Sequence, residues 1–135
     1  MDTQSLTVYR EILKPDFDWD NFQDRSTLVE LAQEAQFLKE IPQRILGKIA
    51  LHVDINTLEK RQAFSKEIGV SYNSLKIYAW VEKRLKGLDV PETIPWTSLR
   101  DIAGTKNPQI WINKVTQEKL SVKEVRKQIK EYEDL

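Results

Sequence analysis

Apolar residues recur three and four positions apart through most of this chain, and too few glycines are present to interrupt that spacing. One run, TLVELAQEAQFLKEI, places its apolar side chains on a single helical stripe formed by Leu28, Leu31, Ala32, Ala35 and Leu38. With only 4 glycines among 135 residues, a turn-rich β architecture is disfavoured. The pattern predicts an all-α protein, a compact bundle of about six to seven helices.

Capping residues mark where the predicted helices begin and end. In the first part of the chain they predict helices over 27–40, 42–52, 56–69 and 71–86, with Ser26, Pro42, Asn56 with Glu59, and Ser71 as starting signals and Gly69 as an end. The segment GLDVPETIP then predicts a loop. Shorter helices follow, opened by Thr97, by Asn107 with Pro108, and by Ser121 with Glu124.

These boundaries divide the chain into parts. Residues 1–25 contain aspartates, Pro15 and the aromatic residues Phe17, Trp19 and Phe22 without helical periodicity, which predicts an extended or loosely helical, acidic aromatic arm. Residues 26–86 are expected to form a helical domain. Residues 87–135 are expected to form a C-terminal helical extension packed on the same core.

Net charge is zero for the whole chain, but the charges are unevenly distributed. Residues 1–42 carry 4 basic and 9 acidic side chains, residues 43–86 carry 9 basic and 4 acidic ones, and the remainder carries 8 of each. Proteins that bind nucleic acid neutralise phosphates with Lys and Arg. The middle segment is therefore the part of the chain suited to such a partner.

Several classes of function lack the residues they need. The chain has no cysteine, which excludes disulfides and thiolate zinc sites and favours a reducing, cytoplasmic location. No phosphate loop, dinucleotide fingerprint or nucleophile elbow occurs, and the single His52 has no companion ligand. No signal peptide or membrane span is predicted. We therefore expect a non-enzyme with no catalytic residue, cofactor, metal site or membrane partner.

The segment RQAFSKEIGVSYNSLKIYAWVEK, within residues 58–86, contains two predicted helices joined by a short turn. Helices that cross steeply need a small residue where they touch, which Ser65 supplies, and a turn residue able to adopt positive φ, which Gly69 supplies. In these features, and in its apolar spacing, the segment resembles the helix-turn-helix family of DNA-binding proteins, although Ser65 stands where alanine is commonest. The apolar positions are Phe64, Ile68, Val70, Leu75 and Tyr78.

The second helix of this pair, residues 72–85, has two distinct faces in helical projection. Its apolar face, expected to meet the core, comprises Leu75, Tyr78, Val81 and Leu85. The resemblance makes this the recognition helix, with Ser71, Tyr72, Asn73 and Lys76 as specificity candidates, because Asn and Lys suit base edges and a helix N-terminus suits phosphate. Further DNA contacts are expected from Trp80, Lys83, Arg84, Lys60, Arg61, Lys66 and Lys48, with Arg44 extending the basic surface.

The following segment, PWTSLRDIAGTKNPQIWINKVTQEKLSVKEVRKQI, is similar in its helix-loop-helix pattern to the region after the helix-turn-helix in plasmid-partition and phage-type proteins of the ParB and KorB class. Together the resemblances imply a bacterial or phage-type protein that binds specific double-stranded DNA as a transcriptional regulator or maintenance factor. Such a protein would be associated with the nucleoid. No residue is assigned a role on the basis of this second resemblance.

Other interpretations of the same residues stay open. One alternative is that the helical pair is a structural hairpin with a solvated face. Another is that the protein is a protein-interaction adaptor that contacts its partner through Trp80 and the acidic arm. The arm itself either packs on its own core, docks on a partner or covers the basic face in competition with DNA. The last helix carries an apolar stripe that forms either a homodimer seam or a core contact, comprising Val122, Val125, Ile129 and Tyr132.

Overall fold

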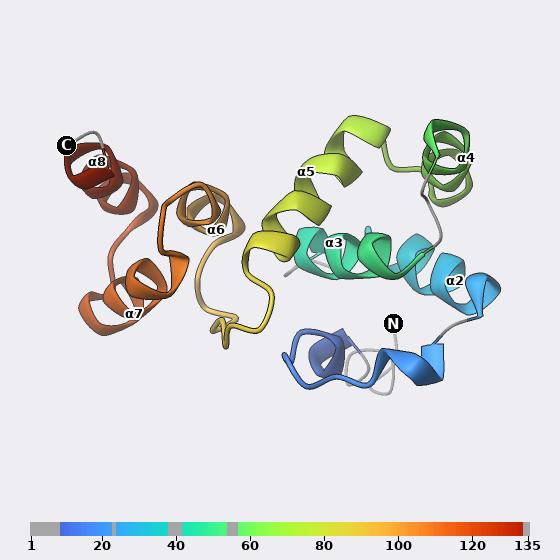
Figure 1. Cartoon of the computed structure of the whole chain (residues 1–135), viewed down its shortest axis with the longest axis horizontal. Helices are drawn as coiled ribbons and strands as arrows, with labels where there is room; N and C mark the ends of the chain where they lie inside the picture. The colour runs from blue at the N-terminus through green and yellow to red at the C-terminus, as the bar shows by residue number, and fades with distance from the viewer. Residues whose placement is uncertain (1–8, 23, 38–41, 54–56, 134–135) are drawn as a thin grey trace. The chain divides into compact units, whose positions relative to one another are not determined.

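The computed structural model describes residues 9–22, 24–37, 42–53 and 57–133, and within these ranges the chain is helical and has no strand. The prediction of an all-α fold is confirmed. None of the described helices combines the length and apolarity that crossing a bilayer requires. The elements in Figure 1 are the 3-10 helix η1 (Trp19–Phe22) and the α-helices α2 (Arg25–Ala35), α3 (Pro42–His52), α4 (Leu58–Ile68), α5 (Tyr72–Arg84), α6 (Trp96–Ala103), α7 (Pro108–Glu118) and α8 (Val122–Glu133).

The chain forms two compact units, a first unit of Met1–Lys83 and a second unit of Arg84–Leu135. The number of helices exceeds the predicted number slightly, because η1 forms inside the segment expected to lack helical periodicity. Residues 9–12 of the same segment are also helical.

The described part of the predicted arm, residues 9–22, belongs to the first unit's core. Tyr9 and Ile12 are fully buried, and the Tyr9 hydroxyl donates a hydrogen bond of 3.0 Å to the Leu31 carbonyl oxygen. Phe17 and Trp19 pack against the same core. Trp19 also stacks on His52, with ring centroids 3.8 Å apart and planes only 6° from parallel. Phe17 and Trp19 therefore pack on the protein's own core, which is one of the alternatives stated for the arm.

Helix α2 anchors the C-terminal end of α4. The side-chain amides of Gln33 and Gln36 donate to the carbonyl oxygens of Glu67 and Ile68, over 2.9 and 2.6 Å. Arg25 forms a two-pronged ion pair with the Glu67 carboxylate at 2.7 and 2.9 Å. These bonds satisfy carbonyl groups that the last turn of a helix leaves without an intrahelical donor.

Two of the helix starts predicted in the first unit were wrong by one or two residues. The N-cap of α2 is Asp24, whose carboxylate accepts from the Ser26 N–H at 3.2 Å, so Ser26 lies inside the helix. The N-cap of α4 is Thr57, whose hydroxyl accepts from the Lys60 N–H; Asn56 lies outside the described residues. Asp24 and Thr57 lie within two residues of the predicted caps and offer equivalent side-chain oxygens. Capping preference alone therefore does not decide which residue is the N-cap. Helix α2 ends at Ala35, and residues 38–40 of the predicted 27–40 helix lie outside the described ranges.

Helix α3 crosses α5 at close range, as Figure 1 shows. The contact point on α3 is Gly47, where an added Cβ would lie 2.4 Å from the Tyr78 carbonyl oxygen of α5. A separation that short is below any ordinary van der Waals contact, so only glycine permits it. The crossing fixes the position of the helix that carries the predicted recognition face.

The second unit packs α6 against α7 and α8. Its buried side chains include Leu99, Ile102, Ile112, Val115 and Val125. Pro108 occupies the first turn of α7 behind the N-cap Asn107, as predicted. The N-cap of α6 is Pro95 and not the predicted Thr97, because the extended backbone of the loop ends two residues earlier.

The predicted capping box at the start of α8 is confirmed. The Ser121 N–H donates to the Glu124 carboxylate at 3.3 Å, and the Glu124 N–H donates to the Ser121 hydroxyl at 3.2 Å. In the stripe predicted as a core contact or dimer seam, Val125 is fully buried and Val122 and Ile129 are half-buried. Tyr132, the fourth residue of the stripe, is 60% exposed. Core contact within the unit therefore accounts for Val125 and in part for Val122 and Ile129, and the dimer seam stays a prediction.

Replacing Ser121 with alanine is expected to lower the free energy of unfolding of the second unit by about 1 kcal/mol, the usual cost of losing an N-cap oxygen. Thermal unfolding followed by circular dichroism measures the change. Thr97→Ala is the matched control, because the exposed Thr97 lies next to a helix start that it does not cap. Equal losses for the two variants would contradict the assignment of the cap.

Candidate nucleic-acid interface

Helices α4 and α5 are joined by the turn that the sequence predicted. Gly69 has φ 76° and ψ 24°, in the left-handed region, and its N–H donates to the Ser65 carbonyl oxygen at 3.0 Å. The Val70 N–H reaches the same carbonyl at 3.2 Å, and the Ser65 hydroxyl donates to the Val70 carbonyl oxygen. Ser65 therefore closes the turn through hydrogen bonds, a role beyond that of a small residue at a crossing.

The first turn of α5 faces solvent. The Ser71 hydroxyl accepts from the Ser74 N–H at 3.2 Å, which makes Ser71 a cap for its own helix. Ser71, Asn73 and Lys76 are exposed, and Tyr72 is half-buried. The other N–H groups of a first turn have no intrahelical acceptor, so an anion such as phosphate is favoured there.

The two predicted faces of α5 are confirmed by burial. Leu75, Val81 and Leu85 are buried and Tyr78 is half-buried. On the other side, Trp80 remains 44% exposed, and Lys76 and Lys83 are exposed. The polar, basic and aromatic face is therefore open within the described part of the chain.

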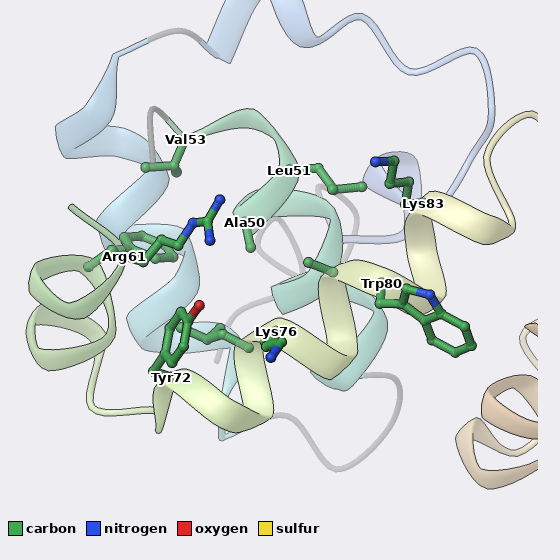
Figure 2. Close-up of a pocket in the computed structure, with 11 residues that line it drawn as sticks. Ala50, Leu51, Val53, Arg61, Tyr72, Lys76, Trp80 and Lys83 are labelled. Atoms are coloured by element: carbon green, nitrogen blue, oxygen red, sulfur yellow. The ribbon is translucent and has the colours of Figure 1, made fainter. Parts of the chain in front are cut away.

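A groove of about 480 Å³ runs beside this face, between α5, the end of α3 and the middle of α4. Figure 2 shows Arg61 and Tyr72 near one end of the groove, and Leu51, Trp80 and Lys83 near the other. The groove gathers five of the predicted DNA-binding residues from two helices, namely Arg61, Tyr72, Lys76, Trp80 and Lys83. Its remaining lining is apolar and comprises Ala50, Leu51, Val53, Phe64, Leu75 and Ala79.

The other predicted contacts on α4 and α5 lie outside the groove. Lys60 and Lys66 are exposed on α4, and Ser71 and Asn73 are exposed at the start of α5. These four residues do not line the groove. The predicted surface is thus a groove with polar and basic side chains around it.

Lys48 and Arg44 do not extend the basic surface as expected. Glu82 of α5 is buried, and its carboxylate lies 3.3 Å from Arg44 Nε and 3.2 Å from Lys48 Nζ. Arg44 is itself buried, at 2% exposed. Since a buried carboxylate holds both cations, they serve the α3–α5 crossing, and the expectation for these two residues was wrong.

Arg84 is exposed, but its guanidinium is bonded to backbone carbonyl groups of the second unit. Its guanidinium donates from Nε to the Ala103 carbonyl oxygen at 2.8 Å and from Nη2 to the Thr105 carbonyl oxygen at 2.7 Å. Both acceptors follow the last turn of α6, where carbonyl groups lack intrahelical donors. These bonds give the residue a role within the second unit, and its expected contact with a DNA backbone stays a prediction.

Sequence reasoning missed Glu82, Gly47 and Leu51. A signal for Glu82 was present, because it follows Leu75 by seven positions and Tyr78 by four and so falls within the apolar arc of α5. An acid at such a position indicates a buried partner. Nothing local singled out Gly47 or Leu51, whose importance depends on which helix α3 meets.

Comparison with protein-family models, curated proteins and solved structures gives no match to this chain. Among the described residues, no three His, Asp or Glu side chains gather into a candidate metal site. The chemistry available at the interface is therefore that of Lys and Arg cations, the Asn73 amide, the Tyr72 and Ser71 hydroxyls and an apolar groove.

Proposed function

We propose that the protein binds double-stranded DNA in a sequence-specific manner through α4, the Gly69 turn and α5, as a transcriptional regulator or a plasmid or phage maintenance factor. The observation that carries the proposal is the exposed start of α5, which follows a left-handed turn and presents Ser71, Asn73 and Lys76 together. In helix-turn-helix proteins, the N-terminal residues of the second helix contact base edges in the major groove.

The charges on these helices support a phosphate partner. Lys60, Lys66, Lys76 and Lys83 are exposed, whereas Glu82 is buried. The carboxylate of Glu67 is paired with Arg25 at 2.7 Å, and this ion pair lowers the pKa of Glu67. Glu59 is the remaining exposed acid of α4 and α5, so the cations still outnumber the acids over the surface that the proposal assigns to DNA.

The proposed contacts divide by chemistry. Asn73 is suited to a bidentate hydrogen bond with adenine, and Lys76 to the acceptor edge of guanine. Lys60 and Lys66 are suited to phosphates, which fix the position of the protein without reading sequence. A homodimer would bind a two-fold site, with half-sites about one helical turn of DNA apart.

The double substitution Asn73→Ala with Lys76→Ala is expected to reduce the ratio of specific to nonspecific DNA affinity by at least roughly tenfold, because each good base contact is worth ~1–3 kcal/mol. The preferred duplex is first selected from genomic fragments retained by the natural protein. Fluorescence anisotropy at several salt concentrations then gives both affinities and the salt dependence.

A matched double variant, Asn113→Ala with Lys127→Ala, removes the same side-chain types from exposed positions of α7 and α8 and should leave the ratio unchanged. Lys60→Ala should weaken binding to all sequences alike and lower the salt slope by about 1. If no genomic fragment binds even at low salt, α4 and α5 are a structural hairpin and the proposal is wrong.

A further inference from the structure

The floor of the groove beside α5 is apolar, although it opens to solvent. Ala50, Leu51 and Val53 form one wall from the end of α3, and Phe64 and Ala79 contribute from α4 and α5. Leu51 is 41% exposed. Ala50, Val53 and Phe64 are themselves buried, so the apolar surface that another molecule could cover is that of Leu51, the 44% exposed Trp80 and the half-buried Ala79.

The groove is elongated along α5. It is lined by this helix from Tyr72 to Lys83, a rise of about 16 Å at 1.5 Å per residue. The opposite wall comes from the last part of α3 and its continuation to Val53. Arg61 and Phe64 of α4 also line the groove. A trough bounded by three helices and extended along one of them suits a short amphipathic helix, which buries an apolar stripe and keeps its other face in water.

The basic side chains at the rim of the groove favour an occupant with negative charge. Among the described residues that line the groove, Arg61, Lys76 and Lys83 are basic and none is acidic. Within the ranges that the structure describes, neither Lys76 nor Lys83 forms an ion pair. An occupant with carboxylates beside an apolar stripe would satisfy both features, whereas a phosphate backbone would use the cations and leave the apolar floor uncovered.

We propose that this groove binds an acidic amphipathic helix of a partner protein. Apolar residues of the partner at positions i, i+4 and i+7 would cover Leu51, Ala79 and Trp80, and its Asp or Glu side chains would pair with Lys76 and Lys83. Double-stranded DNA is the competing occupant, and the experiment below separates the two.

A partner helix in the groove would also compete with DNA, and this inference rests on the function proposed above. Tyr72, Lys76, Trp80 and Lys83 line the groove and also belong to the proposed DNA-binding face. One ligand covering these side chains excludes the other. The acidic helix would therefore release the protein from DNA.

The test uses the full-length protein and a phage-displayed library of helical peptides, each with a fixed leucine stripe and randomised flanking positions. Selection is expected to enrich Asp and Glu beside the stripe. The selected peptide is then synthesised with a fluorophore, and its affinity is measured by anisotropy. Recovery of no binding helix, or of helices with basic or neutral flanks, would overturn the proposal.

Charge and apolar variants locate the peptide. Lys83→Glu and Leu51→Ser are each expected to weaken the acidic peptide by at least roughly tenfold, a loss of about 1.4 kcal/mol. Lys127→Glu makes the same charge change on an exposed residue of α8 and should have no effect. Equal losses for Lys83→Glu and Lys127→Glu would show that the peptide responds to net charge and not to the groove.

Two variants distinguish failure of this proposal from failure of the DNA proposal. Asn73 does not line the groove, so Asn73→Ala should reduce DNA sequence preference and leave peptide affinity unchanged. Leu51→Ser should weaken the peptide and leave DNA affinity within about twofold, since no charge is removed. If Leu51→Ser impairs DNA binding as strongly as peptide binding, the groove belongs to the DNA surface and the partner helix is rejected.

Discussion

Replacing Glu82 with alanine is expected to lower the free energy of unfolding of the first unit by about 3–5 kcal/mol. The Glu82 side chain is 1% exposed and its carboxylate lies between Arg44 and Lys48 of α3. The Arg44 side chain is 3% exposed, so its charge stays buried when the carboxylate is removed. Urea denaturation followed by far-ultraviolet circular dichroism and tryptophan fluorescence measures the loss.

Two further variants separate the charge effect from the loss of side-chain volume. Glu30→Ala removes an exposed carboxylate from α2 and should change stability by no more than about 0.5 kcal/mol. The double variant Arg44→Met with Glu82→Leu replaces the ion pair by apolar side chains and should be within about 1 kcal/mol of the natural protein. A double variant as unstable as Glu82→Ala would contradict the view that unbalanced buried charge causes the loss.

Gly47→Ala is expected to destabilise the first unit by about 3 kcal/mol, at the upper end of the usual cost of overpacking. The added methyl group would lie 2.4 Å from the Tyr78 carbonyl oxygen and 2.7 Å from its carbonyl carbon. These are backbone atoms, so relief requires α3 and α5 to move apart, and a rotamer change is insufficient. Thermal and urea denaturation measure the effect.

The control for this variant uses the intrinsic preference of a helix for alanine. Ala63→Gly, at an exposed position in the middle of α4, should cost about 1 kcal/mol through helix propensity alone. Gly47→Ala gains that same preference and should still be destabilising. A stabilised Gly47→Ala protein would show that the two helices tolerate a wider crossing.

Features set by residues within a few positions of one another were predictable from the sequence. Gly69 adopts the left-handed conformation at the end of α4, and Ser121 with Glu124 forms both bonds of a capping box. The core side of α5 followed from its apolar spacing. Each depends on a helix and its own ends, whose chemistry is contained in one short stretch of chain.

Features set by contacts between distant segments were not predictable. Arg44 and Glu82 are 38 residues apart, and the sequence carries no mark that they meet. The local basic surplus of residues 43–86 therefore overstated the exposed charge, because Arg44 is buried with Glu82 and the half-buried Lys48 pairs with the same carboxylate. The burial of Tyr9 and Ile12 was missed for the same reason.

The sequence by itself determined an all-α chain, the approximate extent of most of its helices, the turn between α4 and α5 and the polar face of α5, because periodicity and capping act over one or two helical turns. Only the tertiary structure decided which cations remain at the surface and that a groove lies beside that face. Both depend on how closely α3 approaches α5, and that distance is set by a glycine on one helix and a carboxylate on the other.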